Sequence, residues 1–92
     1  MKPANWSTEK NIRLKAERGV SFEEVLSAMS NGGLLAVLNR PNPDHYPNQQ
    51  MLVVRIRAYA YLVPFVETEN EVFLKTIIPS RKATRQYLSE EN

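Results

Sequence analysis

Three apolar segments in the second half of the chain constrain its fold most. They read MLVVRI (51–56), YLVPFV (61–66) and VFLKTII (72–78), and only short stretches separate them. Runs of this length that are rich in Val, Ile, Tyr and Phe are typical of β-strands. LLAVL, residues 34–38, reads as a further short buried strand. Consecutive strands joined by short turns pair in antiparallel fashion, so the sequence predicts a four-stranded antiparallel sheet.

The connections between these strands carry different turn signals. Arg57 and Ala58 would form a tight turn, although Gly or Asn is usual at such positions. TENE, residues 68–71, is a clearer turn. The stretch NRPNPDHYPNQQ (39–50), with three prolines, is a long loop for so small a domain, and such loops are functional or mobile.

Two helices are predicted ahead of the sheet. Ser7 can cap a helix over residues 8–18 that ends at Gly19, with a thin apolar stripe of Ile12 and Ala16. The second helix is better signalled. Its start is a capping box and hydrophobic staple, its core stripe follows at i, i+3, i+4 and i+7, and Asn-Gly-Gly stops it. The residues are Ser21 with Glu24, Val20 with Val25, the stripe Phe22, Val25, Leu26 and Met29, and the stop at 31–33.

A third helix is predicted after the sheet. Pro79 ends the last strand because it cannot donate a ladder hydrogen bond, and Ser80 is a natural N-cap. Ala83 and Tyr87 share the face that can pack on the sheet. The other side carries Arg81, Lys82 and Arg85. The predicted class is therefore α+β, with two N-terminal helices, a four-stranded antiparallel sheet and a C-terminal helix, and with the helices over one face of the sheet.

Length and composition exclude several kinds of site. Ninety-two residues make one domain, 1–92. The chain has no cysteine, which excludes a disulfide, a zinc–thiolate site and a thiol nucleophile. Its single histidine, His45, excludes a multi-histidine metal site, and no metal or cofactor is expected. No segment approaches the roughly 20 apolar residues of a membrane span, so we expect a cytoplasmic protein without membrane association.

The charge is unevenly placed. The net charge is +2, but Lys75 and the three cations of the predicted third helix follow Glu71 with no acid before Glu90. Such a patch suits an anionic partner such as nucleic acid; alternatively it is a solvated helix face. Arg81 and Lys82 oppose the helix dipole at a cost of a few tenths to about 1 kcal/mol each. A bound phosphate would reverse the sign of that effect.

Two segments carry motifs of a known family. The first comprises Trp6, Lys10 and RGVSFEE (18–24), and the second is TIIPSRKA (76–83), followed by Tyr87. They resemble the tryptophan, the lysine, the KHG-V-x-F-E-E signature and the R-I-I-S-A-R-K-A segment with its tyrosine in the BrnT family of bacterial toxins, small relatives of the RelE-like ribonucleases. The likeness spans nearly the whole chain.

The chain departs from the family pattern at several positions. Glu17 and Arg18 stand for the family's lysine and histidine, and Thr76, beside Lys75, stands for the arginine that opens the last motif. PSR replaces SAR. The chain therefore resembles a divergent branch of the family.

The resemblance has functional implications. It implies a toxin of a type II toxin–antitoxin pair that cuts RNA or blocks translation, acting on mRNA at or near the ribosome. It further implies neutralisation by a ribbon-helix-helix (CopG/BrnA-like) antitoxin. The complex would repress its own operon, and operator DNA would be contacted only through the antitoxin.

Metal-independent RNA cleavage proceeds by attack of a 2′-hydroxyl on the adjacent phosphate, and it needs a base, an acid and cations. Arginine binds two phosphate oxygens with its planar fork, but it is a poor base. The candidate catalytic residues are Arg81, Lys75, Arg55 and Arg18, and the candidate RNA-binding residues are Arg85, Lys82, Tyr59, Tyr61 and His45.

Most of these candidates also have a structural interpretation. Lys75 would be a solvated strand lysine, Arg55 the partner of an internal carboxylate, and Arg18 a cation at a helix C-terminus. Tyr59 and Tyr61 would belong to the core. At the level of function, two alternatives stay open: a non-catalytic module that holds an antitoxin as a co-repressor, and a degenerate toxin that has lost activity.

Overall fold

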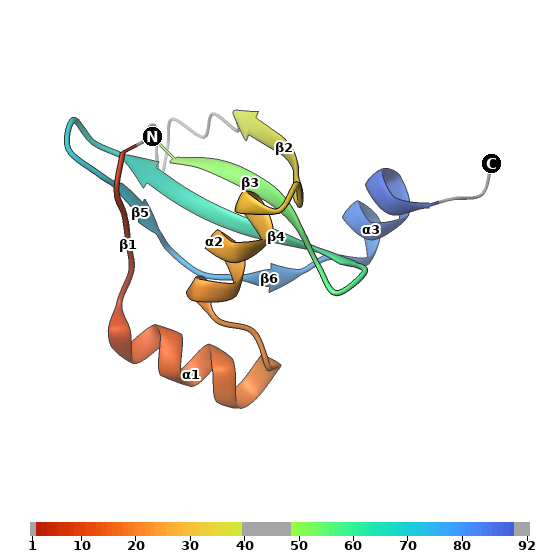
Figure 1. Ribbon diagram of the computed structural model, residues 1–92, viewed down its shortest axis with the longest axis horizontal. Helices are drawn as coiled ribbons and strands as arrows, with labels where there is room; N and C mark the ends of the chain where they lie inside the picture. Colours follow the sequence, from red (N-terminus) through yellow and green to blue (C-terminus); the bar gives the residue numbers. More distant parts are fainter. Residues whose placement is uncertain (1, 40–48, 90–92) are drawn as a thin grey trace.

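The computed structural model describes residues 2–39 and 49–89. A short strand and two helices come first, five strands follow, and a helix ends the described chain (Figure 1). Their bounds are β1 Ala4–Asn5, α1 Thr8–Arg18, α2 Phe22–Ser30, β2 Leu34–Asn39, β3 Gln49–Ile56, β4 Tyr59–Glu67, β5 Val72–Leu74, β6 Ile78–Pro79 and α3 Arg81–Leu88. None of the helices in these ranges has the length and apolar character needed to cross a membrane.

The strands of the described residues form one mixed sheet. Its order is β1-β5-β4-β3-β2, and β6 pairs with β4 beside β5. Every pairing is antiparallel except that of β1 with β5, which is parallel. The α+β class is confirmed, but the prediction of four antiparallel strands was wrong. The short β1 has no strand pattern in its sequence, and it joins the sheet only by pairing with β5. The backbone N–H of Val72 donates to the Pro3 carbonyl at 2.9 Å.

The predicted strand 72–78 is split into β5 and β6. Leu74 pairs with Phe65 and Ile78 pairs with Leu62, so four residue steps on this segment face three steps on β4. One extra residue interrupts a ladder and bends the strand. The segment therefore pairs with β4 at both ends, and its middle is irregular.

Helix α1 begins and ends where the sequence predicts. The Ser7 hydroxyl accepts a hydrogen bond from the Lys10 N–H at 3.1 Å, and Gly19 ends the helix with φ of 71°. The predicted apolar stripe was wrong, because Ile12 is 66% exposed and Leu14 is buried. Positions two apart lie about 200° around a helix, so burying Leu14 turns Ile12 to solvent.

Helix α2 is held by the predicted capping box. The Ser21 hydroxyl accepts from the Glu24 N–H, and the Glu24 carboxylate accepts from the Ser21 N–H at 3.0 Å. Phe22 is fully buried and its ring stacks on Trp6 with centroids 5.5 Å apart. This stacking joins the start of α2 to the segment before α1.

Asn11 links the two helices through polar contacts that the sequence did not reveal. Its side-chain oxygen accepts from the Phe22 N–H at 2.7 Å, and its amide donates to Glu23 at 2.8 Å. The bond from Asn11 lowers the pKa of the Glu23 carboxyl. Asn11 therefore satisfies a first-turn N–H of α2, which has no partner within its own helix.

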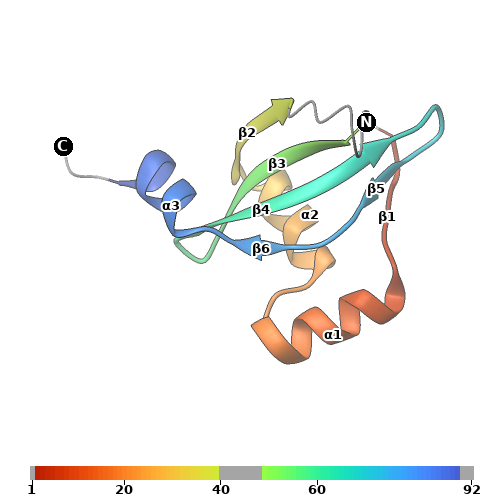
Figure 2. The same ribbon diagram turned by 180° about the vertical axis from the view of Figure 1, so that it is seen from behind.

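The helices cover both faces of the sheet, so the prediction that they lie over one face was wrong. α1 and α2 cover the main core, whereas α3 packs at one end of the opposite face (Figures 1 and 2). Neighbouring strand residues point to opposite faces, and Val53 and Val54 are both fully buried. The main core comprises Leu14, Val20, Phe22, Val25, Leu52, Val54, Ile56, Val63, Phe65, Leu74 and Ile77, and the smaller cluster is centred on Val53, Ala60 and Ala83.

The predicted tight turn at Arg57 and Ala58 is confirmed. The two residues have φ of 52° and 70°, and they join β3 to β4 directly. Positive φ at both central residues is the geometry of a type I′ hairpin turn, whose twist matches that of the paired strands. The hairpin therefore carries two side chains in a conformation that favours glycine or asparagine.

Ala58→Gly is expected to stabilise the protein. A left-handed conformation costs an L-residue about 1–2 kcal/mol, and glycine removes this cost. Because glycine also gives the unfolded chain more conformational freedom, the net increase in unfolding free energy is about 0.5–1 kcal/mol. The exposed Ala16 in the last turn of α1 offers the matched control, since Ala16→Gly should destabilise by up to about 1 kcal/mol. Chemical denaturation of both variants measures the difference, and a loss of stability in Ala58→Gly would contradict the expectation.

Candidate nucleic-acid interface

The first turn of α3 presents two exposed cations. Ser80 caps the helix as predicted, with its hydroxyl accepting from the Ala83 N–H at 3.0 Å. Arg81 and Lys82 follow at once and are exposed, and this turn contains no acidic residue. Arg85 is exposed one turn later. The positive end of the helix dipole thus coincides with two positive side chains.

Helix α3 is attached to β4 by its other side. The Ser80 N–H donates to the Ala60 carbonyl at 3.0 Å, and the Ala60 N–H donates to the Thr84 hydroxyl at 2.8 Å. Thr84 in turn donates to the Ser80 carbonyl at 2.8 Å. With Ala83 buried and Tyr87 packed beside it, this bonding turns the basic side of α3 outward.

Arg18 reaches from the end of α1 to the segment before α3. Its guanidinium donates to the backbone carbonyl of Ile77 at 2.6 Å, and Ile77 is fully buried. A guanidinium has five N–H donors, so this bond leaves others free for a ligand. The contact fixes the C-terminal end of α1 beside β6.

Tyr59 and Tyr61 lie on the same face of β4, and each is half-buried. Their ring centroids are 5.7 Å apart at an interplanar angle of 69°, and Tyr61 packs against the main core. Tyr61 is paired with Pro79 in the sheet register. The tyrosine pair therefore lies next to β6 and to the chain that enters α3.

Sheet pairing thus gathers one set of candidates at one end of the molecule. Arg18 bonds to the residue before β6, Tyr61 pairs with the last residue of β6, and Arg81 begins α3 two residues later. We call this region the basic end and define it as Arg18, Tyr59, Tyr61, Arg81 and Lys82. Tyr61 packs on the face that α1 and α2 cover, and the α3 cations lie at the same end on the side of the opposite face. The basic end therefore offers rings that can stack on bases and cations that can contact phosphates.

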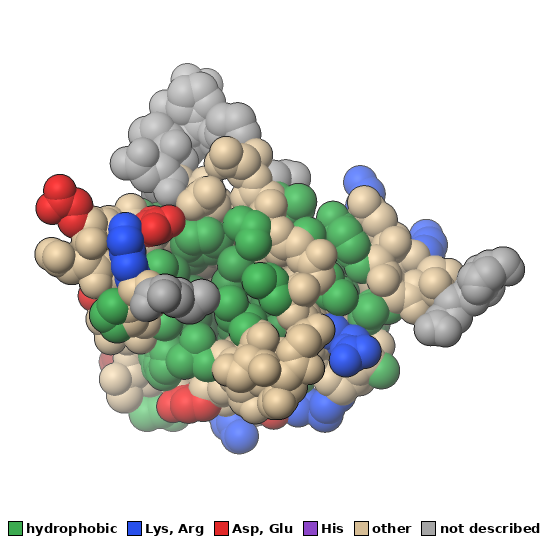
Figure 3. All heavy atoms as spheres, turned by 45° about the horizontal axis from the view of Figure 1, so that its top comes forward, with side chains coloured by type: hydrophobic (Ala, Val, Ile, Leu, Met, Phe, Trp, Pro, Cys, Tyr) green, Lys and Arg blue, Asp and Glu red, His purple; other side chains and the backbone are tan. Residues whose placement is uncertain are grey.

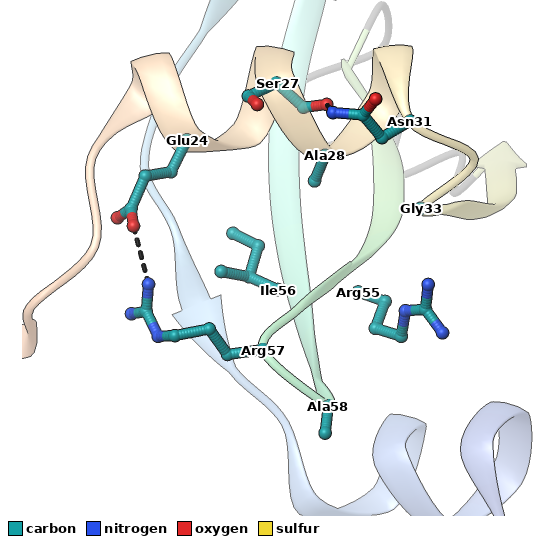
Figure 4. Close-up of a pocket in the computed structure, with 9 residues that line it drawn as sticks. All are labelled: Glu24, Ser27, Ala28, Asn31, Gly33, Arg55, Ile56, Arg57 and Ala58. Carbon is teal, nitrogen blue, oxygen red and sulfur yellow. Dashed lines mark hydrogen bonds and ion pairs between the residues drawn. The ribbon is translucent and has the colours of Figure 1, made fainter.

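The two other candidate catalytic residues differ in position. Arg55 lies on the face of the sheet that carries α3, and it pairs with Ala60, to which Ser80 and Thr84 are hydrogen-bonded. Its side chain points away from the Arg57–Glu24 pair (Figure 4). Lys75 lies in the irregular stretch between β5 and β6, with its ammonium 5.9 Å from the ring centroid of Phe73. The four candidate catalytic residues are therefore not all in one place, and His45 lies outside the described residues.

The sequence indicated Arg57 only as a turn residue and did not reveal the contacts of its side chain. Its guanidinium contacts the Glu24 carboxylate at 2.6 Å (Figure 4). It also donates to the Gly19 carbonyl at 2.9 Å. Within residues 2–39 and 49–89 the ion pairs are Arg57–Glu24 and Lys2–Glu67, so Arg55 has no carboxylate partner there. Arg57, Glu24 and Arg55 all line an open hollow of about 420 Å³, and Glu24 neutralises only one of its two arginines.

The described part of the chain contains no group of three His, Cys, Asp or Glu residues placed to hold a metal ion. Comparisons of the chain with models of protein families, with curated proteins and with solved structures found no match. The family resemblance therefore rests on the two sequence motifs.

Proposed function

We propose that this chain is the toxin of a type II toxin–antitoxin pair, that it cleaves RNA without a metal ion, and that a ribbon-helix-helix (CopG/BrnA-like) antitoxin neutralises it. The observation that carries the proposal is the first turn of α3, with Arg81 and Lys82 exposed and no acid beside them. Free N–H groups, the helix dipole and a guanidinium fork can there act on one phosphate. The two motifs, in which Arg81 matches the family's arginine, support the same function.

Each part of the basic end would have its own role in RNA cleavage. Arg81 would hold the scissile phosphate bidentately and stabilise the charge that develops as the 2′-hydroxyl attacks. Arg18 would contact a neighbouring phosphate while its bond to Ile77 holds it in position. Tyr59 and Tyr61 would stack on bases. Their hydroxyls and the Lys82 ammonium are the groups at this end that can exchange a proton.

The same exposed cations suit the partner. A segment of antitoxin that covers α3 would be acidic, because Arg81, Lys82 and Arg85 are all exposed on its outer side. Covering this helix would block the proposed RNA contact and neutralise the toxin.

One observation favours a second candidate function. Arg18 stands where the family has a histidine, and a guanidinium cannot act as a general base. The chain would then be a non-catalytic module that binds the antitoxin as a co-repressor, or a toxin that has lost its activity. The RNA assay below separates this possibility from the first.

The proposed function predicts two linked results. Expression of the chain alone should arrest bacterial growth, and co-expression of the adjacent reading frame should restore it. The purified chain should cut single-stranded RNA in the presence of EDTA and leave 2′,3′-cyclic phosphate ends, because the 2′-hydroxyl is the nucleophile. Growth curves and mapping of the RNA ends are the measurements.

The control for this experiment is Arg13→Ala, which removes one exposed arginine of α1 outside the basic end. It should retain both growth arrest and cleavage. Normal growth and intact RNA with verified folded protein would reject the ribonuclease and leave the co-repressor function. Cleavage that EDTA abolishes would reject the metal-independent mechanism.

A further inference from the structure

The two edges of the sheet differ in how they are protected. One edge is β1, which has two residues and follows Lys2 and Pro3. Shortness, lysine and proline are the usual devices that keep an edge strand from pairing with another chain. The other edge is β2, which has six residues, reads LLAVLN, and contains no charge and no proline. Only one of the two edges is therefore blunted by its sequence.

Among the described residues, the backbone of β2 is paired along one side only. Within residues 2–39 and 49–89 it pairs with β3 alone. A register shift between Leu34 and Ala36 disturbs its start, but the pairing from Ala36 to Asn39 is regular. The regular part thus presents unpaired N–H and C=O groups in the spacing of a strand that could accept another strand.

The side chains beside this edge are apolar and exposed. Val37 is 53% exposed and Leu34 is 39% exposed, and both line a hollow of about 370 Å³ on the face that carries α2. Figure 3 shows this hollow as a field of apolar side chains with charged groups at its margin. The two charged residues that line it, Lys2 and Glu67, are paired with each other at 3.0 Å. The opposite face of β2 carries Leu35 and Leu38, which are half-buried.

We propose that β2 is the interface of a symmetric dimer, in which it pairs antiparallel with β2 of a second copy of this chain. A two-fold axis perpendicular to the sheet places identical surfaces against each other. A charged side chain near the axis would therefore lie close to the same charge on the second copy and repel it. β2 meets this condition because it is neutral, apolar on both faces and extended. The two α2 helices would lie on the same side of the continuous sheet, and their Leu26 and Met29 side chains would join the hollows of both copies.

Size decides how tight this dimer can be. A six-residue strand spans about 20 Å, and pairing along it buries less area than the roughly 1,200 Å² of a small stable interface. Side chains of α2 must therefore add to the buried area. We therefore expect a dissociation constant on the order of micromolar. The dimer does not involve the basic end, and its test is independent of any RNA chemistry.

Sedimentation velocity of the full chain over a range of micromolar concentrations tests the proposal. The wild type should pass from monomer to dimer and form no larger species. Val37→Lys should weaken dimerisation by at least about tenfold, because it sets two like charges near the axis. Ile12→Lys, on α1 at 66% exposure, is the matched control and should dimerise like the wild type. Circular dichroism verifies that both variants are folded.

Amide hydrogen exchange of the wild type gives a second measurement that needs no variant. Raising the concentration should increase the protection of β2 amides and leave those of α1 unchanged. A monomer at every concentration would overturn the proposal and leave the edge to a different extended partner. Open-ended association, or equal weakening by Val37→Lys and Ile12→Lys, would overturn it as well.

Discussion

Arg81→Ala is expected to abolish growth arrest and to slow RNA cleavage by at least about 100-fold, the usual cost of removing one electrostatic contact to a transition state. The physical reason is the position of Arg81 in the first turn of α3, where its fork would hold the phosphate that becomes more negative during attack. The fold should remain intact because the side chain is exposed. The melting temperature should stay unchanged or rise slightly, since a cation leaves the positive end of the helix dipole.

Two further variants sharpen this result. Arg81→Lys should restore activity only in part, because an ammonium retains the charge and loses the bidentate geometry. Arg13→Ala removes another exposed arginine, outside the basic end, and should leave activity unchanged. A sharp fall in the melting temperature of Arg81→Ala would identify Arg81 as a structural residue. A variant that alters neither quantity would identify it as a surface charge.

Gly33→Ala is expected to have the largest effect on stability. A Cβ at this position would lie 2.8 Å from the Ala28 carbonyl oxygen and 2.9 Å from the Arg55 carbonyl oxygen. Both atoms belong to the backbone, and Gly33 is itself bonded to the same two residues, to Ala28 at 2.7 Å and from Arg55 at 2.8 Å. Relieving the clash would therefore separate α2 from the start of β2. We expect a loss of about 3 kcal/mol from overpacking and a weakened hydrogen bond.

The neighbouring glycine provides the matched control. Gly32 has φ of 84° and open space around its Cβ position, so Gly32→Ala should cost only the about 1 kcal/mol of a left-handed alanine. For a domain of this size, Gly33→Ala should lower the melting temperature by about 15 °C and Gly32→Ala by about 5 °C. Thermal unfolding of both variants measures this. Equal losses would mean that the backbone around Gly33 yields without cost.

Helix bounds and the orientation of α3 could be predicted from the sequence because local interactions determine them. Ser7, Ser21 and Ser80 cap the three helices through bonds to residues three positions away. The separation of Ala83 from Arg81 and Lys82 follows from the helical period alone. The basic face of the candidate site was therefore predictable.

The assembly of the site was not predictable in the same way. Arg18 meets Ile77 across 59 residues, and Ala60 meets Thr84 across 24. The sequence placed Arg55 with Arg18 as catalytic candidates. Strand alternation instead sets Arg55 on the face that carries α3, whereas Arg18 ends α1, which covers the other face. Contacts of this kind depend on which strands pair and in which register.

The sequence by itself determined the helix ends, the apolar strands and the turn at Arg57 and Ala58. Each of these features depends on residues that are close to one another in the sequence. Tertiary structure alone decided the parallel pairing of β1, the division of 72–78 into two strands and the burial of Leu14 in place of Ile12. It also decided that α3 covers the face opposite α1 and α2. Strands that are apolar on both sides need cover on both faces, and only packing determines which helix supplies it.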